Sequence, residues 1–504
     1  MLIGDWTSTL KGLHRKKRAI VDVSHNRTLT YEQLASRVDL SAAALRAAGV
    51  TKGSRVALLS RNRSECFEIL FACARLGALY IPLNWRLSPS EIAWMLRDSK
   101  PDCLLLEEEF VSKLGPDALS SAYLLGAPSH GSPHSPSWEE QLTKRRNEPR
   151  IPQALLSDDD PWIVLYTSGT TGHPKGALLP FRQLAYNALN TIAALSLGPK
   201  DSTITYTPLF HTGGLNVLST PLLVQGGMIV LTDGFDASTI LRLQEKYATT
   251  LLFGVPTTLE MLSRDPAFRS ANLGAIRLTL CGGAPCPHTL IRVYTQAGIV
   301  FKQGYGLTEV GPNCLNLHED DVEARPGSVG LPNLSITARV YSESGAVLSG
   351  GGTGELALMG PCVFLGYLNQ PPLALREGQY FMTGDTVRVD DDGYISIVGR
   401  SKDMFISGGE NVYPAEVERV LATHPAIRGV AVVGVSDSKW GEVGRAYIET
   451  RLESSEAHLA DLRFWAREHL AAYKVPKEFV AVDNLPRNAT GKVQKHLLPK
   501  ESNP

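Results

Sequence analysis

The densest run of chemically capable residues in this sequence is Tyr166-Thr-Ser-Gly-Thr-Thr-Gly-His-Pro-Lys-Gly176, which directly follows the apolar run Ile163–Leu165. Its glycines let backbone N–H groups approach an anion closely, its hydroxyls add hydrogen-bond donors, and Lys175 adds a mobile positive charge. The run therefore predicts a phosphate-binding loop. It is not a Walker loop, because that motif needs Gly-Lys-Ser/Thr, whereas Pro174 precedes Lys175 here and Gly176 follows it.

Six further motifs follow along the chain: Tyr206-Thr-Pro-Leu-Phe-His-Thr-Gly-Gly214, Gly304-Tyr-Gly-Leu-Thr-Glu309, Thr383-Gly-Asp385, Gly399-Arg-Ser-Lys-Asp403, Gly408-Gly-Glu-Asn411 and Pro486-Arg-Asn-Ala-Thr-Gly-Lys492. In kind, order and spacing the set resembles the adenylate-forming acyl-CoA synthetases, a family related to luciferases and to the adenylation domains of peptide synthetases. The resemblance covers nearly the whole chain. It implies that a carboxylate attacks the α-phosphate of ATP to give an acyl-adenylate and pyrophosphate, and that a thiol then displaces AMP.

The first step brings an anion against a polyanion, so it requires cations placed where negative charge develops. The resemblance implies that Lys492 approaches the substrate carboxylate and the α-phosphate, that Glu309 holds Mg²⁺, and that Thr308 donates to the α-phosphate. Lys175 is the fourth catalytic residue that it implies. The loop residues that would hold the β- and γ-phosphates are Thr167, Ser168, Gly169, Thr170, Thr171, Gly172 and Lys175. ATP, Mg²⁺ and coenzyme A are the expected cofactors.

The nucleoside is expected to lie against a second group of residues. Tyr305, directly after Gly304, offers a ring face for adenine. The turn formed by Gly282, Gly283 and Ala284 allows close approach of the backbone. Asp385 can accept hydrogen bonds from both ribose hydroxyls. Together they predict an adenosine site.

The acyl pocket is expected beside Gly283, Gly306 and His211. Acetyl-selective relatives carry a bulky tryptophan at the position that matches Gly306, so glycine leaves room there for a longer or wider acid. His211 lies where relatives place an aromatic gate or a neighbour of the carboxylate. Acetate is therefore disfavoured. The resemblance predicts a medium- or long-chain, aryl or other bulky carboxylic acid, without identifying which.

Three functions fit these motifs to different degrees. The first is a CoA ligase for such an acid, the second an acyl-AMP ligase that loads a carrier protein, and the third a nucleotide-binding scaffold without catalysis. Gly408 and Gly409 match the loop with which relatives line the pantetheine tunnel, which favours CoA as the thiol. The presence of both Glu309 and Lys492 argues against the scaffold.

The elements that must position these motifs alternate along the chain. Apolar runs of strand length at 56–59 and 78–83 alternate with helical spacing at 66–76 and 88–96, and the alternation continues through the strand-like run at 300–303. It predicts α/β layers, stacked as two subdomains. From Gly330 to Gly399 the apolar runs are short and broken by Gly and Pro, which indicates a smaller β-rich subdomain with few helices.

A fresh pattern begins after Gly399–Asp403, with helices expected at 414–422 and 460–471 and strands at 430–435 and 446–450. We therefore expect residues 1–400 to form a large N-terminal adenylation domain and residues 401–504 a small, mobile α+β C-terminal lid domain. The resemblance assigns Arg400 to ribose contact and Lys402 to the hinge. Because Lys492 and the Gly408–Gly409 loop serve different half-reactions, the lid is expected to rotate between them.

Composition narrows the class of protein. The chain has 504 residues, 50 Lys+Arg against 51 Asp+Glu, and 43% hydrophobic residues, as expected for a large globular protein and not for a minimal binding module or a nucleic-acid-binding surface. No apolar stretch approaches the roughly 20 residues of a membrane span, and Met1–Trp6 does not resemble a signal peptide. Seven cysteines without Cys-x-x-Cys spacing favour a reducing cytoplasm. Whether the chain forms a homodimer is left open.

Overall fold

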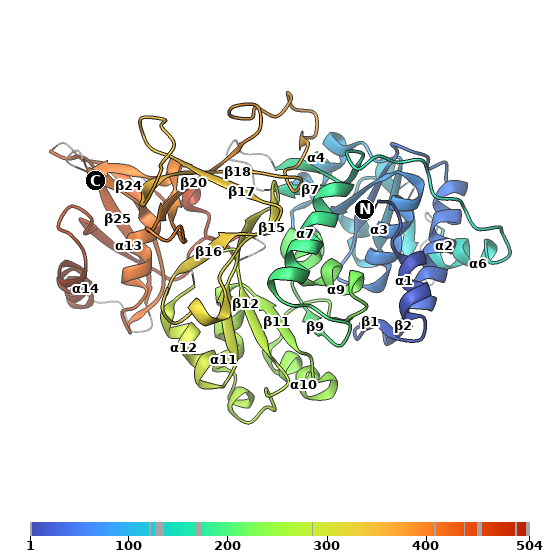
Figure 1. Ribbon diagram of the computed structural model, residues 1–504, viewed down its shortest axis with the longest axis horizontal. Coiled ribbons are helices and arrows are strands. Elements are labelled where there is room, and N and C mark those ends of the chain that lie inside the picture. The colour runs from blue at the N-terminus through green and yellow to red at the C-terminus, as the bar shows by residue number, and fades with distance from the viewer. Residues whose placement is uncertain are drawn as a thin grey trace.

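The computed structural model describes residues 3–119, 122–126, 136–167, 174–284, 286–407, 410–437, 439–450, 456–488 and 491–499. These residues form four β-sheets with helices against their faces. In Figure 1 three of the sheets, drawn blue to yellow and orange, make up a broad N-terminal body, and the fourth, orange and red, lies at one end. The arrangement confirms the predicted α/β fold with a β-rich part and a separate C-terminal domain.

The first sheet carries the two ends of the predicted phosphate loop. Its order is β19 (Gly366–Tyr367), β8 (Lys175–Pro180), β7 (Pro161–Thr167), β4 (Leu79–Leu83), β3 (Arg55–Leu59), β5 (Cys103–Glu107) and β6 (Ala122–Leu125). The strands from β7 to β6 run parallel, whereas β8 returns antiparallel to β7 and β19 pairs antiparallel with β8. The strands predicted at 56–59 and 78–83 are β3 and β4.

The second sheet is also mostly parallel. Its order is β13 (Val300–Gln303), β12 (Leu278–Cys281), β11 (Leu251–Gly254), β9 (Ser202–Thr205), β10 (Met228–Leu231), β1 (Arg18–Asp22) and β2 (Arg27–Thr30), and only β2 is antiparallel to its neighbour. Helices α10 (Ala237–Tyr247), α11 (Pro256–Arg264) and α12 (His288–Gln296) connect its strands. Because parallel strands end at the same edge, Gly282 after β12 and Gly304 after β13 emerge side by side, where open α/β sheets bind ligands.

Helix α3 (Ser64–Leu76) lies between these two sheets. It contacts β4 of the first sheet and β1 of the second, and every one of its residues is buried. The helix stops at Gly77, whose φ of +71° is a left-handed conformation that glycine adopts without cost. Helix α2 (Tyr31–Ala47), which begins at a capping box between Thr30 and Gln33, packs against α3.

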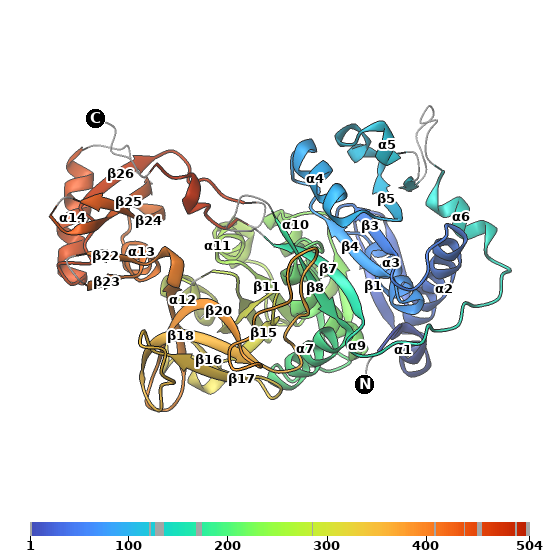
Figure 2. The ribbon, with the colours of Figure 1, turned by 90° about the horizontal axis from the view of Figure 1, so that it is seen from above.

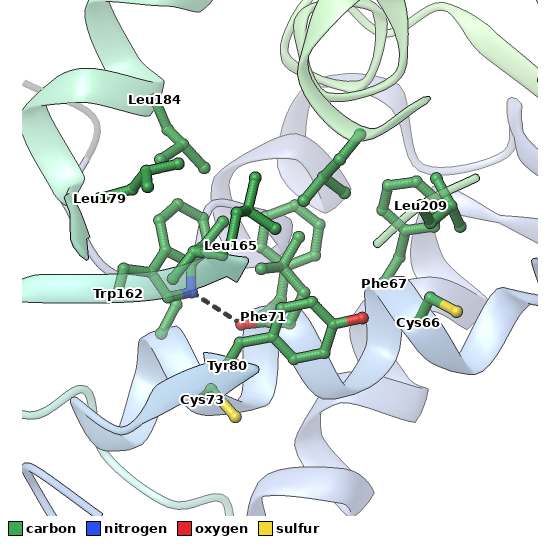
Figure 3. Packing of buried hydrophobic residues seen from close by; sticks show 14 of the residues in the cluster. Cys66, Phe67, Phe71, Cys73, Tyr80, Trp162, Leu165, Leu179, Leu184 and Leu209 are labelled. Atoms are coloured by element: carbon green, nitrogen blue, oxygen red, sulfur yellow. Dashed lines mark hydrogen bonds between the residues drawn. The ribbon is translucent and has the colours of Figure 1, made fainter. Parts of the chain in front are cut away.

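Aromatic packing fixes the stem of the phosphate loop to this core (Figure 3). Trp162 of β7 stacks on Phe181 at 4.8 Å between ring centroids and tilts against Phe71 of α3 at 6.0 Å. Its Nε1 donates to the Leu70 carbonyl at 3.0 Å, so the buried indole is satisfied. Phe181 begins α7 (Phe181–Ala194), which therefore packs on the same cluster.

The third sheet forms the predicted β-rich part. Its order is β14 (Tyr305–Leu307), β15 (Gly311–Asn316), β16 (Ser328–Pro332), β21 (Ile395–Arg400), β20 (Phe381–Val389), β18 (Gly352–Met359) and β17 (Thr337–Tyr341), and all its pairs are antiparallel. All residues from Gly330 to Gly399 are described, and they contain no helix. The expected scarcity of helices is confirmed.

The C-terminal sheet follows a short 3₁₀ turn, η5 (Ser401–Asp403). It consists of β23 (Glu410–Val412), β22 (Phe405–Ser407), β25 (Gly441–Thr450) and β24 (Ile427–Asp437), with β26 (Glu478–Val482) paired to β25. Helices α13 (Pro414–Leu421) and α14 (Glu456–His469) pack with it, close to the predicted helices. Among the helices of the described residues, none combines the length and apolar character needed to cross a bilayer.

Candidate active site

The two ends of the predicted phosphate loop meet in the β7–β8 hairpin. Thr167 and Lys175 are direct partners, and the Thr167 hydroxyl donates to the Lys175 carbonyl at 3.4 Å. The Lys175 Nζ lies 5.5 Å from the centroid of the Tyr367 ring, within cation–π range. The loop positions Ser168, Gly169, Thr170, Thr171 and Gly172 lie outside the described residues.

Beside this hairpin, the strand ends bring the predicted metal-binding carboxylate to Tyr367. The Tyr367 hydroxyl donates to Glu309 Oε1 at 2.8 Å. Thr308, which is buried, is fixed through its carbonyl, which accepts from Gln183 Nε2 at 2.8 Å. No group of three or more His, Cys, Asp or Glu side chains within the described ranges is arranged as a metal cluster. A single carboxylate fits Mg²⁺, which usually takes one or two protein carboxylates and completes its shell with water and substrate phosphates.

The predicted adenosine residues lie at neighbouring strand ends. The Gly304 N–H donates to the Cys281 carbonyl at 2.8 Å, which fixes the start of the Tyr305 segment beside the glycine turn. Gly283 in that turn has a φ of +82°, in the left-handed region that favours glycine, and Ala284 follows it in the exposed part of the turn. The backbone of the two glycine segments therefore lies close together, and Gly283 and Ala284 are exposed there.

Asp385 is the centre of a charged group. Its Oδ2 accepts from the Tyr305 hydroxyl at 2.6 Å, and its Oδ1 pairs with Arg400 Nε at 2.8 Å. Burial raises the pKa of Asp385, and the Arg400 charge opposes that rise. Asp385 and Arg400 are direct partners across β20 and β21, so the sheet itself places them together.

Lys492 lies over this group. In Figure 2 the red C-terminal segment extends from the C-terminal sheet back toward α11. A Cβ on Gly491 would lie 3.4 Å from Thr257 Oγ1 of α11, so the turn before Lys492 rests on the N-terminal body. The Lys492 side chain keeps surface accessible to solvent. Desolvation by the surrounding protein nevertheless lowers the pKa of Lys492, and the positive charge of Arg400 lowers it further. The negative charge of Asp385 opposes this decrease.

His211 lies close enough to Lys492 to be affected by its charge. It is half-buried and precedes the short helix α8 (Thr212–Gly214). Desolvation, together with the positive charges of Lys492 and Arg86, lowers the pKa of His211 to about 4. The imidazole is therefore neutral near pH 7 and can donate or accept a hydrogen bond without adding charge.

The acyl side contains a packing restraint that the sequence interpretation did not anticipate. A Cβ on Gly306 would lie 2.2 Å from the carbonyl carbon and oxygen of Pro312, so the glycine permits the close approach of β14 and β15. Backbone atoms of β15 occupy the space that a side chain at position 306 would need. Gly213 and Gly282 are different, since a Cβ at either would lie 3.5 Å from the Phe253 ring, in ordinary contact.

The positions predicted for the hinge and for CoA are described only in part. Lys402 is exposed in η5, between the end of β21 and the start of β22. The Ser401 hydroxyl lies 3.0 Å from the Thr386 hydroxyl, a hydrogen bond just before the hinge position. Gly408 and Gly409 lie outside the described residues, although the flanking Ser407 and Glu410 pair in the β22–β23 hairpin.

Sequence reasoning missed Tyr367, Gln183, Phe253 and Thr257. Tyr367 is 58 positions from Glu309, and a Gly-Tyr pair carries no chemical signature of its own. Gln183 holds its contact from within α7, and Thr257 from α11, where each reads as an ordinary helix residue. The pairing of β19 with β8 helps bring Tyr367 to the site, and no local pattern encodes that pairing.

Comparison with known proteins gives consistent matches. Residues 11–368 match the family model described as AMP-binding enzyme, and residues 416–492 match that of the AMP-binding enzyme C-terminal domain. A feruloyl-CoA synthase of Amycolatopsis sp is 39% identical over 477 residues, 94% of each chain. An indoleacetate–CoA ligase of Aromatoleum aromaticum is 40% identical over 505 residues, 98% of this chain and 97% of that one.

Among solved structures, the o-succinylbenzoate CoA synthetase of Bacillus subtilis in complex with its acyl-adenylate intermediate superposes with a TM-score of 0.87 at 29% identity, over 99% of this chain and 98% of that one. The same enzyme has been solved with ATP and a magnesium ion.

Proposed function

Because the chain belongs to the AMP-binding enzyme family, we propose that it is an ATP-dependent CoA ligase that activates a bulky, aryl carboxylic acid through an acyl-adenylate. AMP and pyrophosphate are the other products. The observation that carries this proposal is a group of polar side chains at one place: the charged Lys492, Asp385 and Arg400, and the neutral His211. Such a group can hold a ribose, a phosphate and a carboxylate next to one another.

The preference for an aryl acid rests on two observations. The relatives at about 40% identity are named for aryl acids, ferulic acid and indoleacetic acid. In addition, the buried Phe253 ring lies between the Gly213 and Gly282 segments, so the predicted acyl pocket would have an aromatic side chain beside it. Gly306 stays part of the proposed pocket through its backbone.

We assign the roles of the site residues as follows. Lys492 would approach the carboxylate and the α-phosphate, Thr308 would donate to that phosphate, and Lys175 with Thr167 and the loop up to Gly172 would hold the other phosphates. Glu309 would hold Mg²⁺, which supplies positive charge to the phosphate oxygens when bound. Adenine would lie against Tyr305, Gly304 and the turn at Gly283 and Ala284. The ribose would be bound by Asp385 and Arg400.

We further propose that CoA, and not a carrier protein, is the thiol acceptor, with Gly408 and Gly409 lining its path. The domain boundary would lie near residue 400 and the hinge at Lys402, where a single short turn joins two sheets. A reducing, cytoplasmic location fits the seven cysteines, all of which are buried free thiols.

The test is CoA-dependent release of AMP with a panel of acids: ferulate, indoleacetate, a long-chain fatty acid and acetate. We expect turnover with an aryl acid and little with acetate. A phosphopantetheinylated carrier protein offered in place of CoA should not support release. AMP release with the carrier protein alone would show that the carrier, and not CoA, is the thiol acceptor. Preference for the fatty acid would overturn the aryl assignment, and ATP binding without any turnover would favour the scaffold.

A further inference from the structure

A short segment next to the site, Phe364–Asn369, is held by backbone hydrogen bonds to two separate parts of the proposed phosphate machinery. The Phe364 N–H donates to the Glu309 carbonyl at 2.8 Å, and the Leu368 N–H donates to the Gly176 carbonyl at 2.7 Å. Between them, Tyr367 pairs with Ala177 in the β19–β8 ladder. The segment thus joins the stem of the phosphate loop to the carboxylate that would bind the metal.

Tyr367 is the one side chain of this segment that contacts both charged groups. Its hydroxyl donates to Glu309 Oε1 at 2.8 Å, and its ring lies under Lys175 at 5.5 Å. The hydroxyl is the donor in this hydrogen bond, because a carboxylate oxygen can only accept. Phe364 packs edge-on against the same ring at 5.0 Å, which restricts its rotation.

This geometry has a direct consequence for Glu309. A glutamate has three rotatable side-chain bonds. A hydrogen bond that already holds it in one orientation reduces the side-chain entropy that is lost when a metal ion binds. The hydrogen bond engages Oε1, while Oε2 accepts no hydrogen bond from the described residues. One oxygen is therefore fixed by the protein, and the other can face the phosphates.

We propose that Tyr367 is a positioning residue for the metal–nucleotide complex: its hydroxyl orients Glu309 toward Mg²⁺, and its ring orients Lys175 toward the phosphates. The inference rests on the proposed function and adds a residue that acts through these two groups. Partners that orient a metal ligand typically change metal affinity or activity by about 10- to 100-fold when they are removed. A purely structural tyrosine would change stability instead.

The experiment measures nucleotide binding rather than turnover. The dissociation constant of α,β-methylene-ATP, which cannot release pyrophosphate, is determined by calorimetry with excess Mg²⁺ and again with EDTA. For the wild type we expect tighter binding with Mg²⁺. For Tyr367→Phe, which removes only the hydroxyl, we expect the Mg²⁺-dependent gain to fall by about 10-fold, while binding in EDTA and binding of AMP stay unchanged.

Two controls separate positioning from folding. Tyr341→Phe removes another tyrosine hydroxyl that donates to a glutamate, Glu377 Oε1 at 2.9 Å, away from the site, and it should bind like the wild type. In a Glu309→Gln background, Tyr367→Phe should have no further effect on the Mg²⁺-dependent gain, because the group it orients is already altered. Tyr367→Leu should in addition weaken binding in EDTA, because the ring under Lys175 is lost.

The outcomes distinguish this inference from the proposed function. A Tyr367→Phe variant with the full Mg²⁺-dependent gain would overturn the positioning role and leave the proposed function intact. An equal loss in EDTA and in Mg²⁺ would also overturn it, since that result describes general damage to the site. A wild-type protein that binds no adenine nucleotide under either condition would overturn the proposed function and this inference with it.

Discussion

Replacing Lys492 by alanine should slow the first half-reaction and spare the second. The charge of this ammonium lies near Asp385 and Arg400 and also acts on His211, which supports the role proposed for it at the substrate carboxylate and the α-phosphate. Removing one preorganised electrostatic contact of this kind costs about 10²–10³ in rate, or roughly 2.7–4 kcal/mol of transition-state stabilisation.

The pKa of Lys492 adds a second expectation. Because enclosure by protein lowers this pKa below the ordinary lysine value, the ammonium loses its proton at a lower pH than a free lysine does. Adenylation should therefore decline as pH rises through the lowered pKa. Lys492→Arg keeps its charge over that range, so its adenylation rate should lack this alkaline decline even if the maximal rate is reduced.

The assay is a pair of single-turnover rates, one for acyl-AMP formation and one for thioester formation from preformed acyl-AMP. Lys246→Ala on α10, which removes an exposed lysine outside the predicted site, is the matched control and should match the wild type in both. Adenylation by Lys492→Ala at the wild-type rate would refute the assigned role. Equal losses in both half-reactions would point to general destabilisation instead.

Three other substitutions test the architecture. Lys402→Pro should keep much of acyl-AMP formation but slow thioester formation severely, because proline fixes φ near about −65° at the proposed hinge; equal effects on the two single-turnover rates would contradict the hinge. Gly306→Ala should lower the melting temperature and adenylation for every acid alike, since its Cβ would meet the Pro312 carbonyl at 2.2 Å; a selective change among acids would show that the position acts through pocket volume. Trp162→Ala should lower the free energy of unfolding by about 3–5 kcal/mol in urea denaturation, and a loss below about 1 kcal/mol would contradict the core role of the Trp162–Phe181 stack.

The sequence was sufficient for the fold. It also supplied the candidate site residues that lie in dense motifs, and their roles stay predictions. Strands β3 and β4 and the helix-free part from Gly330 to Gly399 were predicted because periodicity and Gly/Pro content are local properties. Lys492 and Asp385 were found from their motifs, and the structure brings their charges together. The domain boundary near residue 400 stays a prediction.

What the sequence did not disclose depends on contacts between distant segments. From the sequence, Gly306 predicts open space in the pocket. In the structure a side chain at this position would meet Pro312, because the register of the β14–β15 hairpin is irregular there. Tyr367 reaches Glu309 from a segment that pairs with a strand nearly two hundred positions earlier in the chain. Neither register nor pairing of this kind can be derived from residue types along one stretch.

The pairing of Asp385 with Arg400 has a consequence for how the lid would move about the proposed hinge. Arg400 is the last residue of β21, and Lys402 follows it after a single residue. A rotation about Lys402 would therefore have its pivot almost at the proposed ribose-binding pair. Lys492 comes after the whole C-terminal sheet in the chain, so it would turn with the lid although its charge lies near this pair. The same turn of the lid would separate Lys492 from Asp385 and leave Arg400 nearly still. The nucleotide could stay anchored by its ribose while the groups around its phosphate are exchanged.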